Sequence, residues 1–267
     1  MGTLPNVAEP ISDARVAAVL RVFVRSCAPL VQRLREDDDD LVEIDADDPE
    51  VDHGFLDKVK DQLAKVKFPG SDSWAKMDAD ARSDWWVSRV GRMTALVASF
   101  TGLAGAIGDR FPLQDMLGSA GQGLLLCAIA AEHGVDDRGT RVRLLAAVLF
   151  DRDIDPVVAA GDGNDEEDER KVEELTAEAV VGDVEEPPKG KKFGVKAAAK
   201  VLWRQGRMLM AISDELGKRP QGRFYHKALG MLPVVGMAGD YLGERSALKR
   251  AAKAANKWLR KQQLITR

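Results

Sequence analysis

The last third of the chain concentrates side chains that could bind anions. From Lys189 to Arg267 the sequence has 19 Lys and Arg residues against 4 Asp and Glu residues, a net charge of +15, whereas residues 1–188 carry a net charge of −19. The total of −4 therefore hides a strongly polarised distribution of charge. A basic segment of this density is typical of a protein that binds a lipid headgroup surface, a nucleic acid or an acidic protein segment.

The densest basic stretch, residues 244–263, has the spacing of an amphipathic helix, with Leu248, Ala255 and Leu259 on one face. Such a helix can lie on an anionic bilayer, where each basic residue contributes about 1 kcal/mol. The same pattern is typical of a helix that packs in the core and exposes a solvated basic face. The alanine-rich apolar side favours this second interpretation. The candidate residues for binding an anionic surface are Arg245, Lys249, Arg250, Lys253, Lys257, Trp258, Arg260 and Lys261.

Residue types that could hold a metal or act as catalysts occur without the spacing that such chemistry needs. The acidic run from Asp162 partly matches a calcium-binding loop, but Glu167 stands where that loop requires glycine, so a solvated charge run is the better interpretation. Cys27 and Cys127 lie in apolar helical surroundings, which indicates buried thiols. None of the three histidines belongs to a metal-type pair. We therefore predict no catalytic residues, metal or cofactor.

Glycines are clustered in apolar stretches of the chain. A helix pays about 1 kcal/mol for glycine relative to alanine, so this clustering indicates close helix packing. Residues 93–108 and 116–131 each contain 16 residues without a charge, fewer than the roughly 18–20 that cross a bilayer as a helix. We interpret them as buried core helices, with a shallow membrane hairpin as the alternative. The candidate packing glycines are Gly102, Gly105, Gly108, Gly118, Gly121, Gly239 and Gly243.

Apolar residues recur at helical spacing along most of the chain, and no segment alternates with period two for long enough to form a sheet. Ser12 is the predicted N-cap of a helix that ends at Glu36, and Gly134 is a predicted left-handed helix C-cap. Asp136 or Asp137 should cap a helix at residues 138–150. The expected fold is all-α, a compact multi-helix bundle with glycine-rich core helices and two acidic, disordered inserts. Further helices are expected at residues 55–67, 71–92, 93–107, 112–133, 193–216 and 244–263. The helices at 71–92 and 93–107 could be continuous, and a short helix at 171–181 is the alternative to disorder there.

Composition divides the chain into five segments. The stretch from Glu36 to Asp52 holds eleven carboxylates, which is typical of a solvated linker. A second acidic segment, poor in large apolar residues, precedes the basic part. The segments are an N-terminal amphipathic helix (1–36), an acidic linker (37–54), the first part of a helical core (55–158), an acidic insert (159–190) and a basic helical part that completes the same domain (191–267).

Three glycine-rich and apolar motifs occur in a fixed order. They are TGLAGAIG at 101–108 with LQDMLGSAG at 113–121, LLLCAIAAEHGVD at 124–136 with RVRLLAAVL at 141–149, and LPVVG at 232–236 before the basic helix. This order resembles the EcsC family of bacterial proteins over residues 93–150 and 193–258. The resemblance implies a cytoplasmic or membrane-peripheral helical protein, and it carries over no catalytic residues.

Charge and resemblance together predict a non-enzymatic protein that associates peripherally with an anionic membrane, or with a membrane protein complex, through its basic C-terminal helix. Its location would be cytoplasmic, on the inner face of the cell membrane, and the acidic inserts would compete for the basic surface. The alternative is a cytoplasmic scaffolding protein whose basic region binds an acidic protein partner. Nucleic acid is a weaker candidate because no reader motif is present and aromatic residues do not interleave with the C-terminal basic ones.

Overall fold

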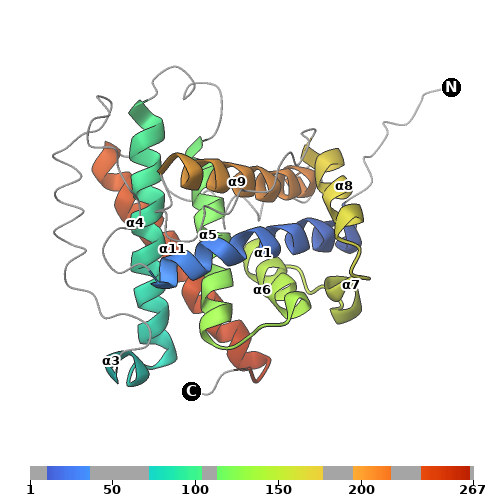
Figure 1. Ribbon diagram of the computed structural model, residues 1–267, viewed down its shortest axis with the longest axis horizontal. Coiled ribbons are helices and arrows are strands. Elements are labelled where there is room, and N and C mark those ends of the chain that lie inside the picture. The colour runs from blue at the N-terminus through green and yellow to red at the C-terminus, as the bar shows by residue number, and fades with distance from the viewer. Residues whose placement is uncertain (1–10, 37–71, 104–112, 177–194, 218–235, 265–267) are drawn as a thin grey trace.

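The computed structural model describes residues 11–36, 72–103, 113–176, 195–217 and 236–264. Helices and connecting loops make up these residues, and they include no strand, which confirms the predicted all-α class (Figure 1). The helices are α1 (Asp13–Glu36), α3 (Asp72–Ala75), α4 (Ala79–Leu103), α5 (Leu113–Glu132), α6 (Arg138–Phe150), α7 (Pro156–Ala160), α8 (Asp165–Thr176), α9 (Val195–Gly217) and α11 (Gly236–Lys261).

Helix α1 lies in the middle of the bundle. It packs against α5, α6, α7, α8 and α9, and in Figure 1 it runs between α9 and α6. Every residue from Val16 to Val24 is buried, including the charged Arg21. An amphipathic helix would bury only one face, so its neighbours enclose the N-terminal half of α1 on all sides.

Helix α5 is the second core helix and packs against α1, α4, α6, α9 and α11. Residues 124–130 are all buried, as the apolar run in the sequence predicts. Where the structure describes helices, none is both long enough and apolar enough to serve as a membrane span.

Several helix ends follow the predicted capping residues. Ser12 precedes α1, and its hydroxyl accepts the backbone N–H of Arg15 at 3.3 Å. Gly134 has φ +69°, the left-handed conformation expected after the end of α5. Asp137 caps α6 by accepting the backbone N–H of Thr140 at 2.6 Å. Local side chains thus set these boundaries, as capping rules predict.

The predicted disorder of the second acidic insert is wrong for residues 159–176. These residues complete α7 and form α8, and α8 packs on α1 and α9. The physical reason is that arginines of α1 neutralise its carboxylates, among them the buried Asp168. The acidic linker at 37–54, the helix expected at 55–67 and the rest of the insert at 177–190 lie outside the described residues.

The helix expected at residues 71–92 is divided in two, and its second part continues through residues 93–103. Short α3 ends at Ala75, and α4 begins at Ala79. Asp78 separates them because its carboxylate accepts the backbone N–H of Ala81 at 2.7 Å, the contact of a helix N-cap. From Ala79 to Leu103 the helix is continuous.

Candidate anionic-surface site

Helix α11 presents two different faces. The side chains of its apolar face are at most 5% exposed, and this face packs against α4, α5 and α6. These side chains are Leu248, Ala251, Ala252, Ala255 and Leu259. The apolar face therefore belongs to the core of the bundle and is covered by protein, as in the packing-helix interpretation of the sequence.

Polar contacts fix the rotation of α11 against α4. The buried Asn256 donates hydrogen bonds from Nδ2 to Asp80 Oδ1 at 2.8 Å and to Ser83 Oγ at 3.0 Å. Arg260 donates to the same Asp80 oxygen at 3.0 Å. These contacts lower the pKa of Asp80, with the Asn256 hydrogen bond as the largest cause and Arg260 and Lys253 adding to it. Residues outside the basic face thus decide which way that face points.

Six of the eight predicted surface residues are exposed along the other side of α11. No ion pair or hydrogen bond joins any of them to a residue that the structure describes. With a rise of 1.5 Å and about 100° per residue, they cover roughly 24 Å of the helix and about half of its circumference. We call this set the α11 basic face: Arg245, Lys249, Arg250, Lys253, Lys257 and Lys261.

The other two predicted residues have structural partners. Trp258 is partly buried against the core, and the Arg143 guanidinium carbon lies 5.7 Å from the centre of a Trp258 ring. Arg260 pairs with Asp80. Helical geometry explains both, since Trp258 falls beside the apolar face and Arg260 faces α4. Trp258 is therefore not an exposed interfacial anchor, and the candidate site consists of cations alone.

The predicted packing glycines differ in what surrounds them. A Cβ on Gly121 would lie 2.9 Å from Thr94 Cγ2 of α4, so this glycine permits close contact. Around Gly118, no described atom would be within 4 Å of a Cβ. Gly105 and Gly108 lie outside the described residues. Gly102, Gly239 and Gly243 lie in stretches of α4 and α11 where only the backbone is described.

A packing glycine that sequence reasoning missed lies at the contact between α9 and α5. A Cβ on Gly206 would be only 2.4 Å from the backbone oxygen of Met116. The available signal was its position in the amphipathic pattern of α9, between Leu202 and Leu209, which are both buried.

The acidic insert binds arginine side chains. Asp165 pairs with Arg25 at 2.7 Å and with Arg138 at 2.6 Å, and the pKa of Asp165 is lowered, first of all by the Arg138 hydrogen bond. Asn164 accepts the backbone N–H of Glu167 and so caps α8. Among the residues that the structure describes, no group of His, Cys, Asp and Glu could hold a metal ion. Several carboxylates of α8 thus bind α1 and α6, and no ion pair joins a described carboxylate of α8 to the α11 basic face.

Sequence reasoning also missed the buried pair of Arg21 and Asp168. Arg21 Nε and Nη2 donate to the two oxygens of Asp168 at 2.7 and 2.6 Å, and both side chains are at most 6% exposed. Arg21 also donates to the backbone oxygen of Val158 at 2.8 Å. The signal that could have found it is a charged residue within an otherwise apolar run from Val16 to Val24.

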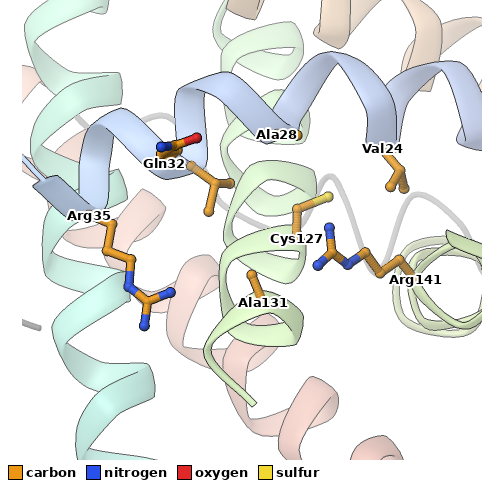
Figure 2. Close-up of a pocket in the computed structure, with 8 residues that line it drawn as sticks. Val24, Ala28, Gln32, Arg35, Cys127, Ala131 and Arg141 are labelled. Atoms are coloured by element: carbon orange, nitrogen blue, oxygen red, sulfur yellow. The ribbon is translucent and has the colours of Figure 1, made fainter. Parts of the chain in front are cut away.

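A pocket of about 350 Å³ lies between α1, α5 and α6 (Figure 2). Arg35 and Arg141 lie toward its opposite ends. Arg141 is held by its hydrogen bonds to Val135 O at 2.6 Å and to Asp136 at 3.2 Å. The lining residues are Val24, Ala28, Val31, Gln32, Arg35, Cys127, Ala131 and Arg141.

Comparisons with known proteins do not assign the chain to a family. No family model, curated protein or solved structure matches this chain. The resemblance to EcsC proteins therefore stays a prediction based on the motifs quoted above.

Proposed function

We propose that this chain is a non-enzymatic, EcsC-like helical protein that binds peripherally to an anionic membrane through the α11 basic face. The binding would occur at the inner face of a bacterial cell membrane. The observation that supports this proposal most is the presence of six exposed cations on one side of α11, none with a described partner. The ligand class is the anionic phospholipid headgroup.

The packing of α11 determines how such binding would work. Because the apolar face of α11 is buried against α4, α5 and α6, the helix has no free face to insert between acyl chains. The protein would rest on the headgroups, and each exposed cation would contribute about 1 kcal/mol at low ionic strength. Screening acts over about 10 Å at 0.1 M salt, so binding should weaken steeply as salt is added.

A flotation assay with phospholipid vesicles tests the proposal. At low salt the protein should float with vesicles that contain phosphatidylglycerol and stay behind with vesicles of phosphatidylcholine alone. High salt should release it. Equal recovery with both vesicle types, or no binding to the anionic vesicles, would contradict the proposal.

The double variant Lys249→Glu/Lys257→Glu tests the role of the α11 basic face. Two lost lysines at about 1 kcal/mol each predict binding at least roughly 30-fold weaker. Lys253 is left in place because its charge helps to lower the pKa of Asp80. The matched control is Lys171→Glu/Lys200→Glu on α8 and α9, which changes the net charge equally. If the α11 variant and the control lose binding to anionic vesicles to the same extent, the total charge of the protein determines binding and the α11 basic face does not.

The alternative function, a scaffold for an acidic protein partner, uses the same cations. It predicts that an acidic polypeptide such as polyglutamate binds wild-type protein but not Lys249→Glu/Lys257→Glu, while anionic vesicles fail to bind either. Membrane binding is favoured here because the cations extend over roughly 24 Å of one exposed helix side, which suits a surface of many separate headgroups.

A further inference from the structure

The fold brings together the two cysteines of the sequence. Cys27 lies on α1 and Cys127 on α5, and both are buried free thiols. Burial raises the pKa of Cys27, and the adjacent Cys127 thiol raises it further. Val24, Ala28 and Val31 of α1 line one pocket together with Cys127, and Cys27 lies on the same side of α1 as these three residues. The two thiols are therefore neighbours where α1 packs against α5.

The two thiols differ in their access to the solvent. Cys127 lines the pocket between α1, α5 and α6, whereas Cys27 is not among the lining residues and has no exposed surface. In Figure 2 the Cys127 side chain extends from α5 toward α1, beside the Arg141 guanidinium. A small molecule that enters the pocket would thus meet Cys127, whereas Cys27 does not form part of the pocket wall.

We infer that Cys127 and Cys27 form a reversible oxidation site, at which a small peroxide oxidises Cys127 and Cys27 then closes an intramolecular disulfide. The pocket of about 350 Å³ is ample for hydrogen peroxide, since one water occupies only about 30 Å³ of liquid. This inference concerns a different part of the molecule from the α11 basic face and does not depend on the proposed membrane binding.

The chemistry has two steps. The Cys127 thiolate attacks one peroxide oxygen, the O–O bond breaks, and the second oxygen leaves as hydroxide and takes up the thiol proton as water. Cys127 is then a sulfenic acid. The Cys27 sulfur attacks the Cys127 sulfur, the S–O bond breaks, and hydroxide leaves with the Cys27 proton as a second water. Two thiols become one disulfide while one peroxide becomes two waters, and a small thiol reverses the change by exchange.

The surroundings suit this order of events. The Arg141 guanidinium lies beside the Cys127 side chain in the pocket. Its positive charge lowers the pKa of Cys27, opposing the larger effect of burial. Because burial and Cys127 together raise the pKa of Cys27, Cys27 stays a thiol until a sulfenic acid forms beside it. Because Cys127 lines the pocket and Cys27 does not, we assign Cys127 as the attacking residue and Cys27 as the resolving one.

Mass spectrometry of the full chain tests the inference. After treatment with hydrogen peroxide, alkylation under denaturing conditions should modify neither cysteine, and the intact mass should fall by about 2 Da for the two hydrogens lost. A non-reduced digest should contain the Cys27 and Cys127 peptides linked together, and a thiol reductant should restore both alkylation sites. Unchanged thiols, chain-to-chain disulfides or irreversible oxidation of Cys127 would each overturn the inference.

Two single variants test the roles of the cysteines. In Cys27→Ser the oxidation should stop at a sulfenic acid on Cys127, which dimedone traps, whereas in Cys127→Ser the buried Cys27 should remain unmodified. The reverse pattern would contradict the assigned order. Circular dichroism checks folding, and Cys27→Ala and Cys127→Ala replace a serine variant that does not fold.

In the wild type, oxidation should also raise the thermal unfolding midpoint, and an unchanged midpoint would argue against a cross-link between α1 and α5.

Discussion

At the scale of single residues, Arg21 shows how the sequence tolerates a charge inside the bundle. Its guanidinium is satisfied by both oxygens of Asp168 and by the carbonyl of Val158. Gly161, with φ +70°, makes room for it, because a Cβ there would lie 2.7 Å from Arg21 Cζ. Pairing and hydrogen bonding compensate the cost of burying both ions, which would be large if either were alone.

Replacing Asp168 with alanine should be strongly destabilising. The change leaves the buried Arg21 cation without its partner, and breaking a buried pair in this way costs about 3–5 kcal/mol. Urea unfolding followed by circular dichroism measures the loss. The control is Glu166→Ala on the same turn of α8, an exposed residue, whose effect should stay within about 0.5 kcal/mol. Equal effects of the two variants would mean that the pair contributes nothing specific.

At the scale of elements, the contact between α5 and α9 depends on a glycine. The backbone of α5 at Met116 approaches Gly206 so closely that a Cβ there would overlap its carbonyl oxygen. Backbone atoms cannot move aside as a flexible side chain can, so α9 would have to shift as a whole. The close approach of these helices is thus decided by one position of α9 and by the backbone facing it.

Gly206→Ala and Gly118→Ala form a matched pair of helical substitutions with opposite expected signs. Gly206→Ala should destabilise the fold by about 1–3 kcal/mol because it forces α9 away from α5. Gly118→Ala should stabilise it by up to about 1 kcal/mol, since alanine is the better helix former and meets no described neighbour there. Unfolding midpoints of the two variants compare them directly. A stabilising Gly206→Ala would show that the two helices can separate at little cost.

At the scale of the whole molecule, its paired carboxylates make the fold sensitive to acid. The pKa values of Asp80, Asp137, Asp165 and Glu167 are all lowered, in each case chiefly by a hydrogen bond that the folded structure provides. A carboxylate with a lowered pKa contributes stability above its ordinary pKa, about 3.9 for Asp, and loses that contribution as pH falls through the folded value. These carboxylates should therefore make stability fall below about pH 4.

Urea titrations at pH 7, 5 and 3 test the predicted acid sensitivity. In Asp137→Asn the amide oxygen can still cap α6 but does not titrate, so this variant should lose less stability than wild type between pH 5 and 3. An unfolding midpoint that stays constant down to pH 3 would contradict the prediction. The same decrease in wild type and variant would show that the Asp137 cap does not contribute to it.

The polarised charge of the chain is resolved into two separate arrangements in the folded protein. Four acidic residues of α8 pair with arginines of α1 or α6, namely Asp165, Asp168, Glu169 and Glu174. The α11 basic face has no such partners among the described residues. The expected competition between the acidic insert and the basic helix therefore has no supporting contact in the described part of the chain.

Much of the helical architecture could be predicted from the sequence because the responsible forces are local. Helical periodicity marked α1, α5, α6 and α9, and capping residues such as Ser12, Gly134 and Asp137 placed their ends. The amphipathic pattern of residues 244–263 also predicted which side of α11 carries the cations. These features depend on residues within one or two turns of each other, so sequence spacing is sufficient to find them.

Only the tertiary structure decided which distant residues meet. The sequence does not show that Arg21 of α1 pairs with Asp168 of α8, or that Gly206 contacts the backbone of Met116. It also does not show that Cys27 and Cys127 are neighbours. It also left open whether the apolar side of α11 faces protein or lipid. The physical reason is that burial and partner choice depend on how helices pack across the bundle, and that packing is not set by the spacing within any one of them.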